Sequence, residues 1–491
     1  MKKTYRVLAF DCGSSNGRIL AGDFDGKLLK LNELNRFPNY PQEMGDVHYW
    51  DVMQMWQNVK LGLKSAASQS HFHSISTDSW GCDLTLLRPD GQMLQNVVSY
   101  RDNSMKKSMD KANSYFSSQD LYKKIGSHYF LSSTVAVLVK IREEYPSILD
   151  AAKSFLHICD YFNFLLSGVM NCEFTIASTS QMMDPRTGQW HWDVIKTLGL
   201  PEKIFLPPVL SGNTLGPLRT FLAEELGMPG VKVIAACGHD SAAAIAAVPA
   251  LSGDPWMCIS SGSWSILMYE TDKTYLDVSG YYGFMHEGCY GGKNRITYNQ
   301  VGLWLIQELR RAFGNPSFDD MDAQAGQVEA FRSIIIPQHY KQMFIPNLPN
   351  SIREYCKKTG QPIPETQGEL VRCAYDSIAI NSAIVIGKME KMIRVEFKKI
   401  YVVGGGTYNA ILLQNIADIT GKEVVAGPKE PAVTGNMLVQ LIAQGELADL
   451  TQARQLVLDS FKVSSYYPAK NARLPDMEHY TREMYDKTEK Q

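Results

Sequence analysis

The sequence predicts an α/β protein of two domains, and three observations support this. The chain has 491 residues, and a single hydrophobic core stops growing at roughly 250 to 300 residues, so a chain of this length divides. Runs typical of strands alternate with runs typical of helices. The segments FDCGSSNGRIL and ISSGSWSIL both read as strand, tight Gly/Ser turn and strand, which indicates two similar domains. The stretch VPALSGDP places the boundary near residue 250, giving domains 1–248 and 249–491.

The first expected domain opens with an antiparallel meander. Residues 6–37 read as three strands separated by a Gly-containing turn and an Asp-Gly turn. Residues 72–92 give a strand, a loop, a strand and a turn, and residues 231–248 give a strand that feeds a helix. Helices are expected over 115–126 and over 147–168, the second of which ends on a glycine.

The second expected domain repeats this beginning. Residues 256–276 read as a second meander with a Gly/Ser turn. Residues 398–421 read as a strand, a triple-glycine turn and a helix.

Charge and cysteine usage exclude several classes of protein. The chain has 49 Lys and Arg against 51 Asp and Glu, a net charge of −2, so we expect small-molecule partners and no nucleic acid. No uninterrupted apolar stretch reaches the ~18 residues of a membrane span, so no membrane partner is expected. The nine cysteines are scattered without metal-binding spacing, which favours a reducing, cytoplasmic location.

The first Gly/Ser turn is a candidate phosphate site. A strand delivers Asp11 to a turn of small residues whose backbone N–H groups can hold phosphate oxygens; these are Ser14, Ser15, Asn16 and Gly17. Asp11 can hold Mg²⁺ through water, and Arg18 can complement phosphate charge. The alternative is a plain β-hairpin turn. Neither the P-loop pattern nor the dinucleotide GxGxxG pattern is present here.

Two further turns have the same chemistry. The second Gly/Ser turn, which contains Ser263, offers hydroxyl and N–H groups suited to the far end of a polyphosphate. The triple glycine Gly404, Gly405 and Gly406 lets a flat ligand or a phosphate approach the backbone closely. Each of these has a structural alternative, a tight connection with no ligand.

The loop from Asp78 to Asp83 is a candidate sugar site. It places Trp80, Gly81 and Asp83 at the end of a strand. An aromatic ring offers a flat apolar face to a sugar, and carboxylates accept hydrogen bonds from hydroxyls. The alternative is that Trp80 belongs to the core. The neighbouring pair Arg101 and Asp102 is equally consistent with a structural ion pair.

Asp240 has two interpretations. It stands between an apolar strand and a run of alanines, where an aspartate commonly caps a helix by accepting from the N–H groups of the first turn. It can also act as a base that takes the proton of a substrate hydroxyl during phosphoryl transfer. A backbone bond can fix the carboxylate while its free oxygen contacts the substrate, so both can hold together.

The order of these motifs resembles the FGGY family of carbohydrate kinases and, within it, the rhamnulokinases. The resemblance covers nearly the whole chain. The motifs that carry it are the first hairpin, DSWGCD, SYRD, GHD, SSGSWS, NQVGLWLIQEL, CKKTGQPIPETQGELVRC, VVGGG and AGPKEPAVTGN.

The resemblance implies two actin-like (ribonuclease H-like) α/β domains with ATP and sugar in the cleft between them. The N-terminal domain would bind sugar and carry catalysis, and the C-terminal domain would bind the nucleotide. Carried over by motif, Asp240 resembles the general base, and the sugar contacts would include His239, Ser241, Gly81 and Asn299. The nucleotide and metal contacts would be Asp11 near Mg²⁺, Ser14 to Arg18 and Ser263 at the phosphates, Gln307 near the nucleotide, and Gly404 to Gly406 at the adenosine.

The resemblance also implies a reaction, the transfer of the ATP γ-phosphoryl group to O1 of a 6-deoxy-ketohexose such as L-rhamnulose. We expect Asp240 to have an ordinary pKa near ~3.9. The alternative is a sugar- or nucleotide-binding protein without turnover, but the presence of Asp11, Arg18 and Asp240 favours the enzyme.

Departures from the family pattern bear on the substrate. Rhamnulokinases usually read Asp-Thr-Trp-Gly-Val-Asp-Phe where this chain has Ser79, Cys82 and Leu84. The stretch TSQMMD at 179–184 is closer to the L-fuculokinases, so L-fuculose is the alternative substrate. Cys356 and Cys373 occupy positions where rhamnulokinases also carry cysteines, and a reducing cytosol favours free thiols there.

Overall fold

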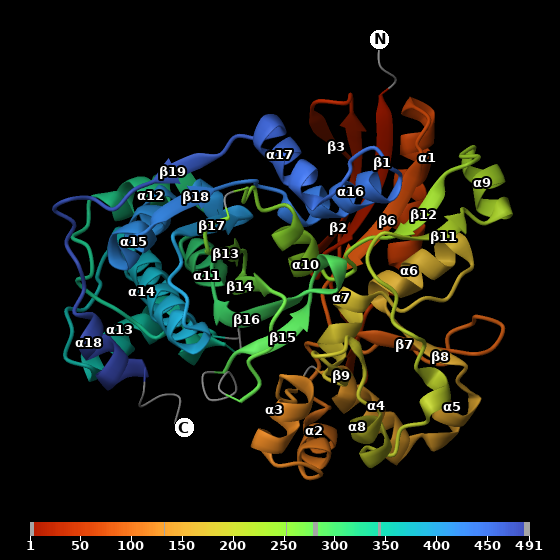
Figure 1. Cartoon of the computed structure of the whole chain (residues 1–491). Coiled ribbons are helices and arrows are strands. Elements are labelled where there is room, and N and C mark those ends of the chain that lie inside the picture. Colours follow the sequence, from red (N-terminus) through yellow and green to blue (C-terminus); the bar gives the residue numbers. More distant parts are fainter. Residues whose placement is uncertain (1–3, 132, 252, 278–282, 342–344, 486–491) are drawn as a thin grey trace. The chain divides into compact units, whose positions relative to one another are not determined.

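The computed structural model describes residues 4–131, 133–251, 253–277, 283–341 and 345–485 (Figure 1). The chain forms two compact α/β units. The first unit consists of Met1–Leu251, Glu270–Ile296 and Pro431–Ser460, and the second of Ser252–Tyr269, Thr297–Glu430 and Phe461–Gln491. Two segments from the C-terminal half of the chain therefore pack with the N-terminal unit.

The first unit is built on a six-stranded sheet. Its spatial order is β11 (Asn213–Pro217), β12 (Lys232–Ala235), β6 (Ser74–Ser79), β1 (Tyr5–Cys12), β2 (Asn16–Phe24) and β3 (Leu29–Pro38). Strands β1, β2 and β3 pair antiparallel, which confirms the predicted meander. Strands β6 and β12 join in parallel, so the carboxyl ends of β1, β6 and β12 lie at one edge.

Helices cover both faces of this sheet. Leu8 and Phe10 of β1 belong to a core that includes residues of α1 (Val52–Gln69), α6 (Ile158–Ser167) and α9 (Thr220–Leu226). On the other face, Gly22 of β2 lies against Met437 of α16. The helices of that face include α10 (Asp240–Ala246) and α16 (Pro431–Ala443), and α17 (Leu450–Ser460) follows α16 in the chain.

The remaining elements of the first unit are short. They are β4 (Gln42–Met44), β5 (Val47–Tyr49), β7 (Leu84–Leu87), β8 (Ser154–His157), β9 (Met183–Asp184), β10 (Gln189–Trp190) and β15 (Met285–Gly288), with the helices α2 (Lys106–Asn113), α3 (Ser118–Ile125), α4 (Thr134–Glu144), α5 (Pro146–Ala151), α7 (Phe174–Ala177) and α8 (Trp192–Thr197). Helix α3 confirms the helix predicted over 115–126.

The single helix predicted over 147–168 is wrong. The segment forms α5, then strand β8, then α6. All four residues of β8 are buried, and the strand pairs antiparallel with β7. This pairing outweighs the local helical preference, because it buries an apolar segment and satisfies its backbone groups at the same time. The predicted end is correct, since Gly168 closes α6 in the left-handed conformation.

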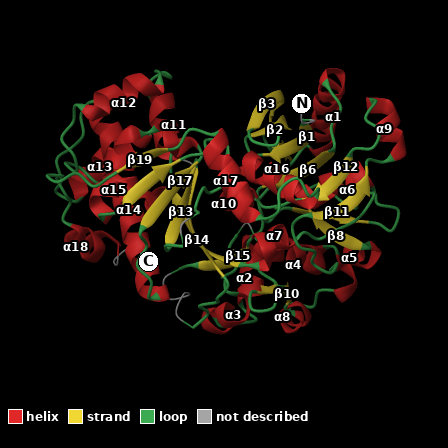
Figure 2. Cartoon of the chain, turned by 45° about the horizontal axis from the view of Figure 1, so that its top comes forward, coloured by secondary structure: helices red, strands yellow, loops and turns green. Residues whose placement is uncertain are grey.

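A seven-stranded sheet dominates the second unit. Its order is β15, β16 (Asn294–Val301), β14 (Trp264–Thr271), β13 (Trp256–Ser261), β17 (Lys399–Val403), β18 (Glu423–Ala426) and β19 (Ser464–Tyr466). Strand β15 and the start of β16 are counted with the first unit. The helices of the second unit are α11 (Trp304–Ala312), α12 (Phe318–Gly326), α13 (Leu348–Lys358), α14 (Gln367–Ile393), α15 (Ala410–Thr420) and α18 (Met477–His479), shown in red in Figure 2.

The two units repeat one strand pattern. Strand β1 pairs antiparallel with β2 and parallel with β6, and β13 pairs antiparallel with β14 and parallel with β17. In each sheet the next strand outward is again parallel, and the one beyond it antiparallel. The sequence echo between the two Gly/Ser hairpins therefore corresponds to a repeated topology, and the predicted α/β fold class is confirmed.

Helix α14 is the long central helix of the second unit. Its length of 27 residues and its apolar composition would suffice for a membrane span, but 83% of its apolar window is buried inside the structure. Burial of this extent is typical of a core helix. A capping box formed by Thr366 and Glu369 fixes its first turn.

All nine cysteines are free thiols. Cys356 of α13 and Cys373 of α14 are both buried. Interaction between the two thiols lowers the pKa of Cys356 and raises that of Cys373. The expectation of free thiols at this pair is confirmed.

The alanine run after Asp240 is explained by helix packing. Helix α10 packs against α16 within the first unit, and Ala242, Ala243 and Ala244 are buried. A Cβ atom on Gly435 of α16 would stand 1.8 Å from the carbonyl oxygen of Ala243 and 2.6 Å from its carbonyl carbon. Small residues on both helices therefore let the two backbones approach closely.

Replacement of Gly435 by alanine should destabilise the protein. The added methyl group would meet backbone atoms that cannot rotate away, so we expect the free energy of unfolding to fall by about 1–3 kcal/mol. Gly387→Ala in α14 is a matched control, because its Cβ would meet no atom of the described residues within 4 Å. The control should be neutral or stabilising by up to ~1 kcal/mol through helix propensity. Urea unfolding measures both, and equal stabilities of the two variants would contradict this account.

Candidate active site

The predicted site residues divide between the two units. The first unit holds Asp11, Ser14 to Arg18, Trp80, Gly81, Asp83, His239, Asp240 and Ser241. The second unit holds Ser263, Asn299, Gln307 and Gly404 to Gly406. Within each unit, most of these residues come from separate parts of the chain and lie at the ends of the strands.

The β1–β2 turn brings the predicted charges together. Asp11 and Arg18 are opposite each other in the antiparallel register, and Arg18 Nε donates to Asp11 Oδ2 at 2.9 Å. Gly13 is required inside the turn, because a Cβ there would stand 2.7 Å from the carbonyl oxygen of Asn16. The hairpin thus holds a carboxylate and a guanidinium as an ion pair beside a turn of small residues.

Arg101 ties this turn to the candidate sugar loop. Its Nη2 donates to the carbonyl oxygen of Ser14 at 3.1 Å and to Ser14 Oγ at 3.3 Å. Its guanidinium lies over the rings of Trp50 and Tyr100. Asp102, the alternative partner, accepts instead from the backbone N–H groups of His48 and Ser104. Sequence reasoning left Arg101 undecided, and the structure makes it a link between two predicted sites.

Asp83 holds the aromatic side chains of the sugar loop. Its Oδ2 accepts from Trp50 Nε1 at 2.5 Å, from Trp80 Nε1 at 2.8 Å and from the N–H of Tyr100 at 3.1 Å. Asp83 is 2% exposed and Trp80 is 8% exposed. Burial raises the pKa of Asp83 to about 7, although the two indole N–H bonds act in the opposite direction. Sugar contacts by Trp80 and Asp83 stay predictions, and Trp80 belongs to the core.

The two motifs that depart from the family pattern are in contact. A Cβ on Gly81 would stand 3.0 Å from three side-chain atoms of Thr179. Cys82 has a left-handed backbone with φ of 78°, and its N–H donates to Thr179 Oγ1 at 3.1 Å. The loop DSWGCD and the stretch TSQMMD therefore pack directly against each other, and a change in either one alters the packing of the other.

A buried glutamate fixes the backbone before Asp240. Glu173 Oε2 accepts from the N–H of Gly238 at 3.0 Å, and Thr175 Oγ1 accepts from the N–H of His239 at 3.2 Å. The carbonyl oxygen of Gly238 accepts from the N–H of Ser79 at 2.9 Å, which joins this segment to the sugar loop. Sequence reasoning missed Glu173 and Thr175. An acidic residue inside the apolar stretch before Phe174 was the available signal.

Asp240 is the first residue of α10 and does not cap it. His239 occupies the N-cap position without a side-chain capping bond, so the capping interpretation is wrong. The Asp240 side chain is 40% exposed. Burial and the Asp11 carboxylate raise its pKa to about 7. The N–H of Ser241 and the charge of Arg295 act in the opposite direction and lower it in part. The expected ordinary pKa is therefore also wrong, because burial and then the nearby Asp11 carboxylate both disfavour the ionised form.

Three carboxylates gather at the carboxyl ends of the central strands. Asp11 and Asp78 are register partners on the parallel strands β1 and β6. Burial and the charge of Asp11 raise the pKa of Asp78 well above its usual range, and Asp240 adds to this effect. Asn436 of α16 donates to Asp78 Oδ2 at 2.6 Å, and Asp78 Oδ1 is buried without a hydrogen-bond partner among the described residues.

This concentration of negative charge fits a cation. The described residues hold no cluster of three or more His, Cys, Asp or Glu side chains arranged as direct metal ligands. Mg²⁺ is usually bound through one or two carboxylates together with water and substrate phosphates. A carboxylate set of the kind formed by Asp11 and Asp78 therefore suits Mg²⁺ held largely by water and nucleotide.

The nucleotide residues predicted in the second unit surround one turn. Ser263 Oγ donates to Gln307 Oε1 at 3.2 Å. The carbonyl oxygen of Ser263 accepts from the N–H groups of Gly302 at 3.0 Å and Trp304 at 3.2 Å. On the other side, a Cβ on Gly406 would stand 2.3 Å from Ser261 Oγ, and Gly404 has φ of 83°. Gly404 and Gly406 are therefore required for close approach to the β13–β14 turn, whereas a Cβ on Gly405 would make only ordinary contacts, at 3.6 Å or more.

Asn299 is exposed on β16 of the second unit. Its carbonyl oxygen accepts from Gln338 Nε2 at 3.1 Å, and Gln338 Oε1 accepts from the N–H of Val301 at 2.9 Å. These two bonds hold the backbone on either side of Gln300 and leave the Asn299 side chain at the surface.

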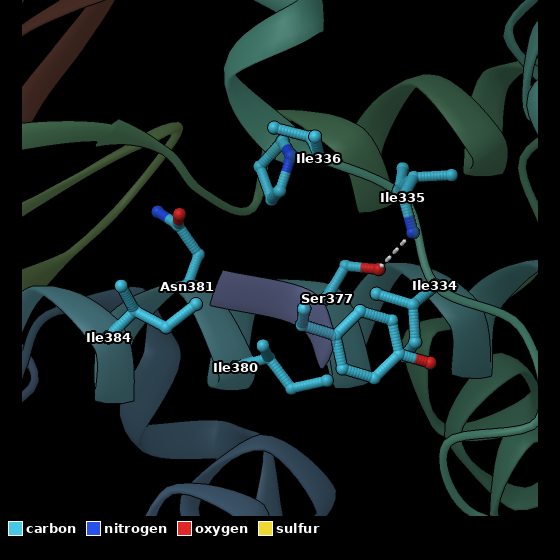
Figure 3. Close-up of a pocket in the computed structure, with 9 residues that line it drawn as sticks. Ile334, Ile335, Ile336, Ser377, Ile380, Asn381 and Ile384 are labelled. Carbon is cyan, nitrogen blue, oxygen red and sulfur yellow. Dashed lines mark hydrogen bonds between the residues drawn. The ribbon is translucent and has the colours of Figure 1, made fainter. Parts of the chain in front are cut away.

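A separate apolar hollow lies in the second unit (Figure 3). Isoleucines from the segment before η5 (Pro337–Tyr340) and from α14 line it, and the ring of Tyr480 lines it as well. The N–H of Ile335 donates to Ser377 Oγ at 2.9 Å across its edge. None of the predicted site residues is among its lining residues, so it is distinct from the candidate site.

Comparison with known proteins identifies the family. A model of the N-terminal domain of the FGGY family of carbohydrate kinases matches residues 6–247, and a model of the C-terminal domain matches residues 257–444. The chain belongs to the FGGY family of carbohydrate kinases. This FGGY kinase is a phosphotransferase that acts on a sugar, and the resemblance seen in the motifs is confirmed.

Relatives of this FGGY kinase are similar to it in sequence or in fold over almost its whole length. It is 34% identical over 470 residues to a rhamnulokinase of Bacteroides thetaiotaomicron, with 95% of this chain and 96% of the relative covered. It is 35% identical over 462 residues to a rhamnulokinase of Oceanobacillus iheyensis, with 94% and 97% covered. A solved xylulose kinase from Rhodospirillum rubrum superposes with a TM-score of 0.81 at 15% identity, covering 99% of this chain and 98% of that one. That likeness confirms the two-domain fold.

Removal of the Glu173 carboxylate should loosen the segment before Asp240. Glu173→Ala leaves the N–H groups of Gly238 and Ile176 without their acceptor, so we expect a loss of about 1–3 kcal/mol in the free energy of unfolding. Amide hydrogen exchange of the peptide that contains Gly238 should become faster. Glu173→Gln is the matched control, because its amide oxygen can keep the same bonds while Ser211 Oγ turns to accept. Unchanged exchange in the alanine variant would show that Glu173 is not the anchor.

Proposed function

We propose that this carbohydrate kinase phosphorylates L-rhamnulose at O1, with ATP as the phosphoryl donor and Mg²⁺ as the cofactor. The observation that carries the proposal is 34% identity to a rhamnulokinase across 95% of the chain. Other rhamnulokinases match at 31–35% identity over the same extent. L-Fuculose is the second candidate substrate, because the contacting surface of Gly81, Cys82 and Thr179 contains both departures from the rhamnulokinase pattern.

We assign roles on this basis. Asp240 is the general base, and the sugar contacts are His239, Ser241, Trp80, Gly81, Asp83 and Asn299. Asp11 carries Mg²⁺ through water. The nucleotide contacts are Ser14, Ser15, Asn16, Gly17 and Arg18 in one turn, Ser263 at the phosphates, Gln307 near the nucleotide, and Gly404, Gly405 and Gly406 at the adenosine. Residues 1–248 would then supply the sugar and catalytic functions, and residues 249–491 most of the nucleotide functions, in a cytoplasmic enzyme.

The proposed reaction is an in-line transfer. The O1 oxygen of the ketose forms a bond to the γ-phosphorus as the bond from that phosphorus to the β,γ-bridging oxygen breaks, and ADP leaves. The O1 proton passes to the Asp240 carboxylate, whose partial exposure leaves it open to a ligand. In phosphoryl transfer the protein mainly positions the reactants and neutralises charge.

Cationic and N–H groups would supply that neutralisation. Arg18 stands beside Asp11 at the first turn, and Arg101 donates to Ser14 of the same turn. When bound near Asp11, Mg²⁺ would offset the charge of the phosphate oxygens. The small residues between Gly13 and Gly17 leave the backbone of the turn accessible to phosphate oxygens.

An assay with a panel of sugars tests the proposal. The purified protein, ATP and Mg²⁺ are incubated with L-rhamnulose, L-fuculose, L-xylulose and D-xylulose, and ADP formation is measured. We expect the highest kcat/KM with L-rhamnulose, and the absence of phosphorylation of every ketose would refute the kinase activity.

Asp240→Asn should lower kcat by ~10² to 10⁴-fold, because it removes the base and keeps the shape.

Two controls accompany the Asp240 variant. Its thermal midpoint and ATP affinity should match those of the unmodified protein, because Asn keeps the volume of the side chain. Asp110→Asn, at an exposed position of α2 in a surface ion pair with Lys106, should keep full activity. Near-normal turnover of Asp240→Asn would exclude Asp240 as the base.

The pH dependence follows from the raised pKa of Asp240. Because only the ionised carboxylate can accept a proton, kcat/KM for the ketose should be maximal above pH 7 and fall as the pH drops through about 7. Asp11, Asp78, Glu287 and Arg295 face this group and set its pKa. Asp83 also has a pKa near 7, so Asp83→Asn is the control and should keep the acidic limb. An acidic limb near pH 4 would contradict the prediction.

A further inference from the structure

Arg295 on β16 is the largest fully buried side chain of the described residues. Its side chain is 0% exposed, and Nη2 donates to Glu287 Oε2 at 2.6 Å. The same nitrogen hydrogen-bonds to His239 Nδ1. Burial of a guanidinium is costly unless it is paired and hydrogen-bonded. A plain structural ion pair would not need the contact with His239, the residue next to Asp240.

This contact fixes which ring nitrogen of His239 carries hydrogen. A guanidinium keeps its protons in proteins, so it can only donate. Nδ1 must therefore present its lone pair to Arg295, and the hydrogen of the neutral ring lies on Nε2. Burial, followed by the charge of Arg295, lowers the pKa of His239 well below its usual range, so the ring is neutral.

The Nε2–H group faces the proposed base. Nε2 lies 3.5 Å from Asp240 Oδ1 and 3.1 Å from Ser241 Oγ, which also lies 3.3 Å from Nδ1. Glu287 Oε2 pairs with Arg295 and lies 3.7 Å from Nδ1, so it balances the charge of Arg295 on the same side of the ring, away from Nε2. Arg295 thus occupies the acceptor nitrogen of the ring, and the donor nitrogen lies beside Asp240 and Ser241.

We propose that Arg295 and Glu287 are positioning residues that hold His239 as a hydrogen-bond donor at Nε2, directed at a sugar oxygen next to the hydroxyl that Asp240 deprotonates. This inference rests on the proposed roles of Asp240 and His239 in the sugar site. Asp240 accepts a hydrogen bond from the hydroxyl that attacks phosphorus, whereas His239 donates one to the adjacent sugar oxygen. The pair therefore recognises two adjacent oxygens, one as a donor and the other as an acceptor.

Arg295→Met tests this directly. Loss of the guanidinium frees Nδ1, so the ring can carry its hydrogen on either nitrogen. Histidine labelled with ¹⁵N, observed by ¹H–¹⁵N correlation NMR and assigned with His239→Ala, should show the Nε2–H form in the unmodified protein and a mixture in Arg295→Met. With the ketose varied, kcat/KM should fall about 10- to 100-fold, the range for one charge-assisted hydrogen bond, and KM for ATP should stay within about twofold.

A double-mutant cycle separates positioning from packing. If Arg295 acts through His239, Arg295→Met should cost less than about twofold further in kcat/KM when His239 is already alanine. Arg295→Lys keeps a donor to Nδ1 and should restore the Nε2–H form in part. Arg454→Met is the matched control: it removes another buried arginine of the first unit, paired with Glu270 at 2.6 Å, and should change stability without changing the His239 tautomer.

The outcomes are distinct. An unchanged tautomer in Arg295→Met, or an equal loss in both backgrounds of the cycle, would overturn the proposal and leave Arg295 as a core ion pair. If Arg295→Met does not fold, Glu287→Gln, which weakens the pair that holds the guanidinium, decides by the same NMR signature, and an unchanged signature there overturns the proposal. The tautomer is measured without ligand, so it still decides if the protein phosphorylates no ketose and the proposed function fails.

Discussion

The site depends on one buried hydrogen bond, from the N–H of Gly238 to Glu173 Oε2. Glu173 accepts as well from Thr175 and Ile176 at the start of α7 and from Ser211. One carboxylate therefore joins a short helix, a loop and the end of β12, which precedes Gly238. Because an unmade buried bond costs more than a made one contributes, this arrangement tolerates little displacement. The position of Asp240, two residues later, follows from it.

Charge balance is the second constraint on the first unit. The Asp11 carboxylate raises the pKa of both Asp78 and Asp240 in addition to the effect of burial, and like charges so close together would oppose folding without compensation. Arg18 pairs with Asp11, and Arg295 lowers the pKa of Asp240 from the other side. The remaining excess of negative charge suits a ligand that brings Mg²⁺. Arg18 and Arg295 thus offset part of this negative charge in the free protein, and a bound cation would offset more of it.

Features set by local sequence patterns could be predicted from the sequence, whereas features set by contacts between distant segments could not. The hairpins around Gly13 and Gly262 and the turn at Gly404 could be predicted, because turn residues and strand alternation are local signals. Strand β8 could not, because the antiparallel pairing with β7 that makes it a strand joins distant segments. Glu173 and Arg295 reach the segment around His239 from 65 and 56 residues away. Their roles come from tertiary contact, which no spacing in the sequence encodes.

The first hairpin of each unit has the same strand pairing, but different side chains lie beside its turn. In the first unit, Asp11 lies opposite Arg18 across the hairpin. In the second, Ser260 occupies the matching place before the glycine of the turn, and it lies opposite Ile266. The antiparallel strand pairing around the turn is common to both, although the turn is one residue longer in the first hairpin, and only the first hairpin carries charges at these positions. The carboxylate of the first hairpin needs a compensating positive charge, which Arg18 supplies, whereas the second hairpin has no carboxylate at this position that would repel an anion. The side chains at two register positions therefore set the charge beside each turn.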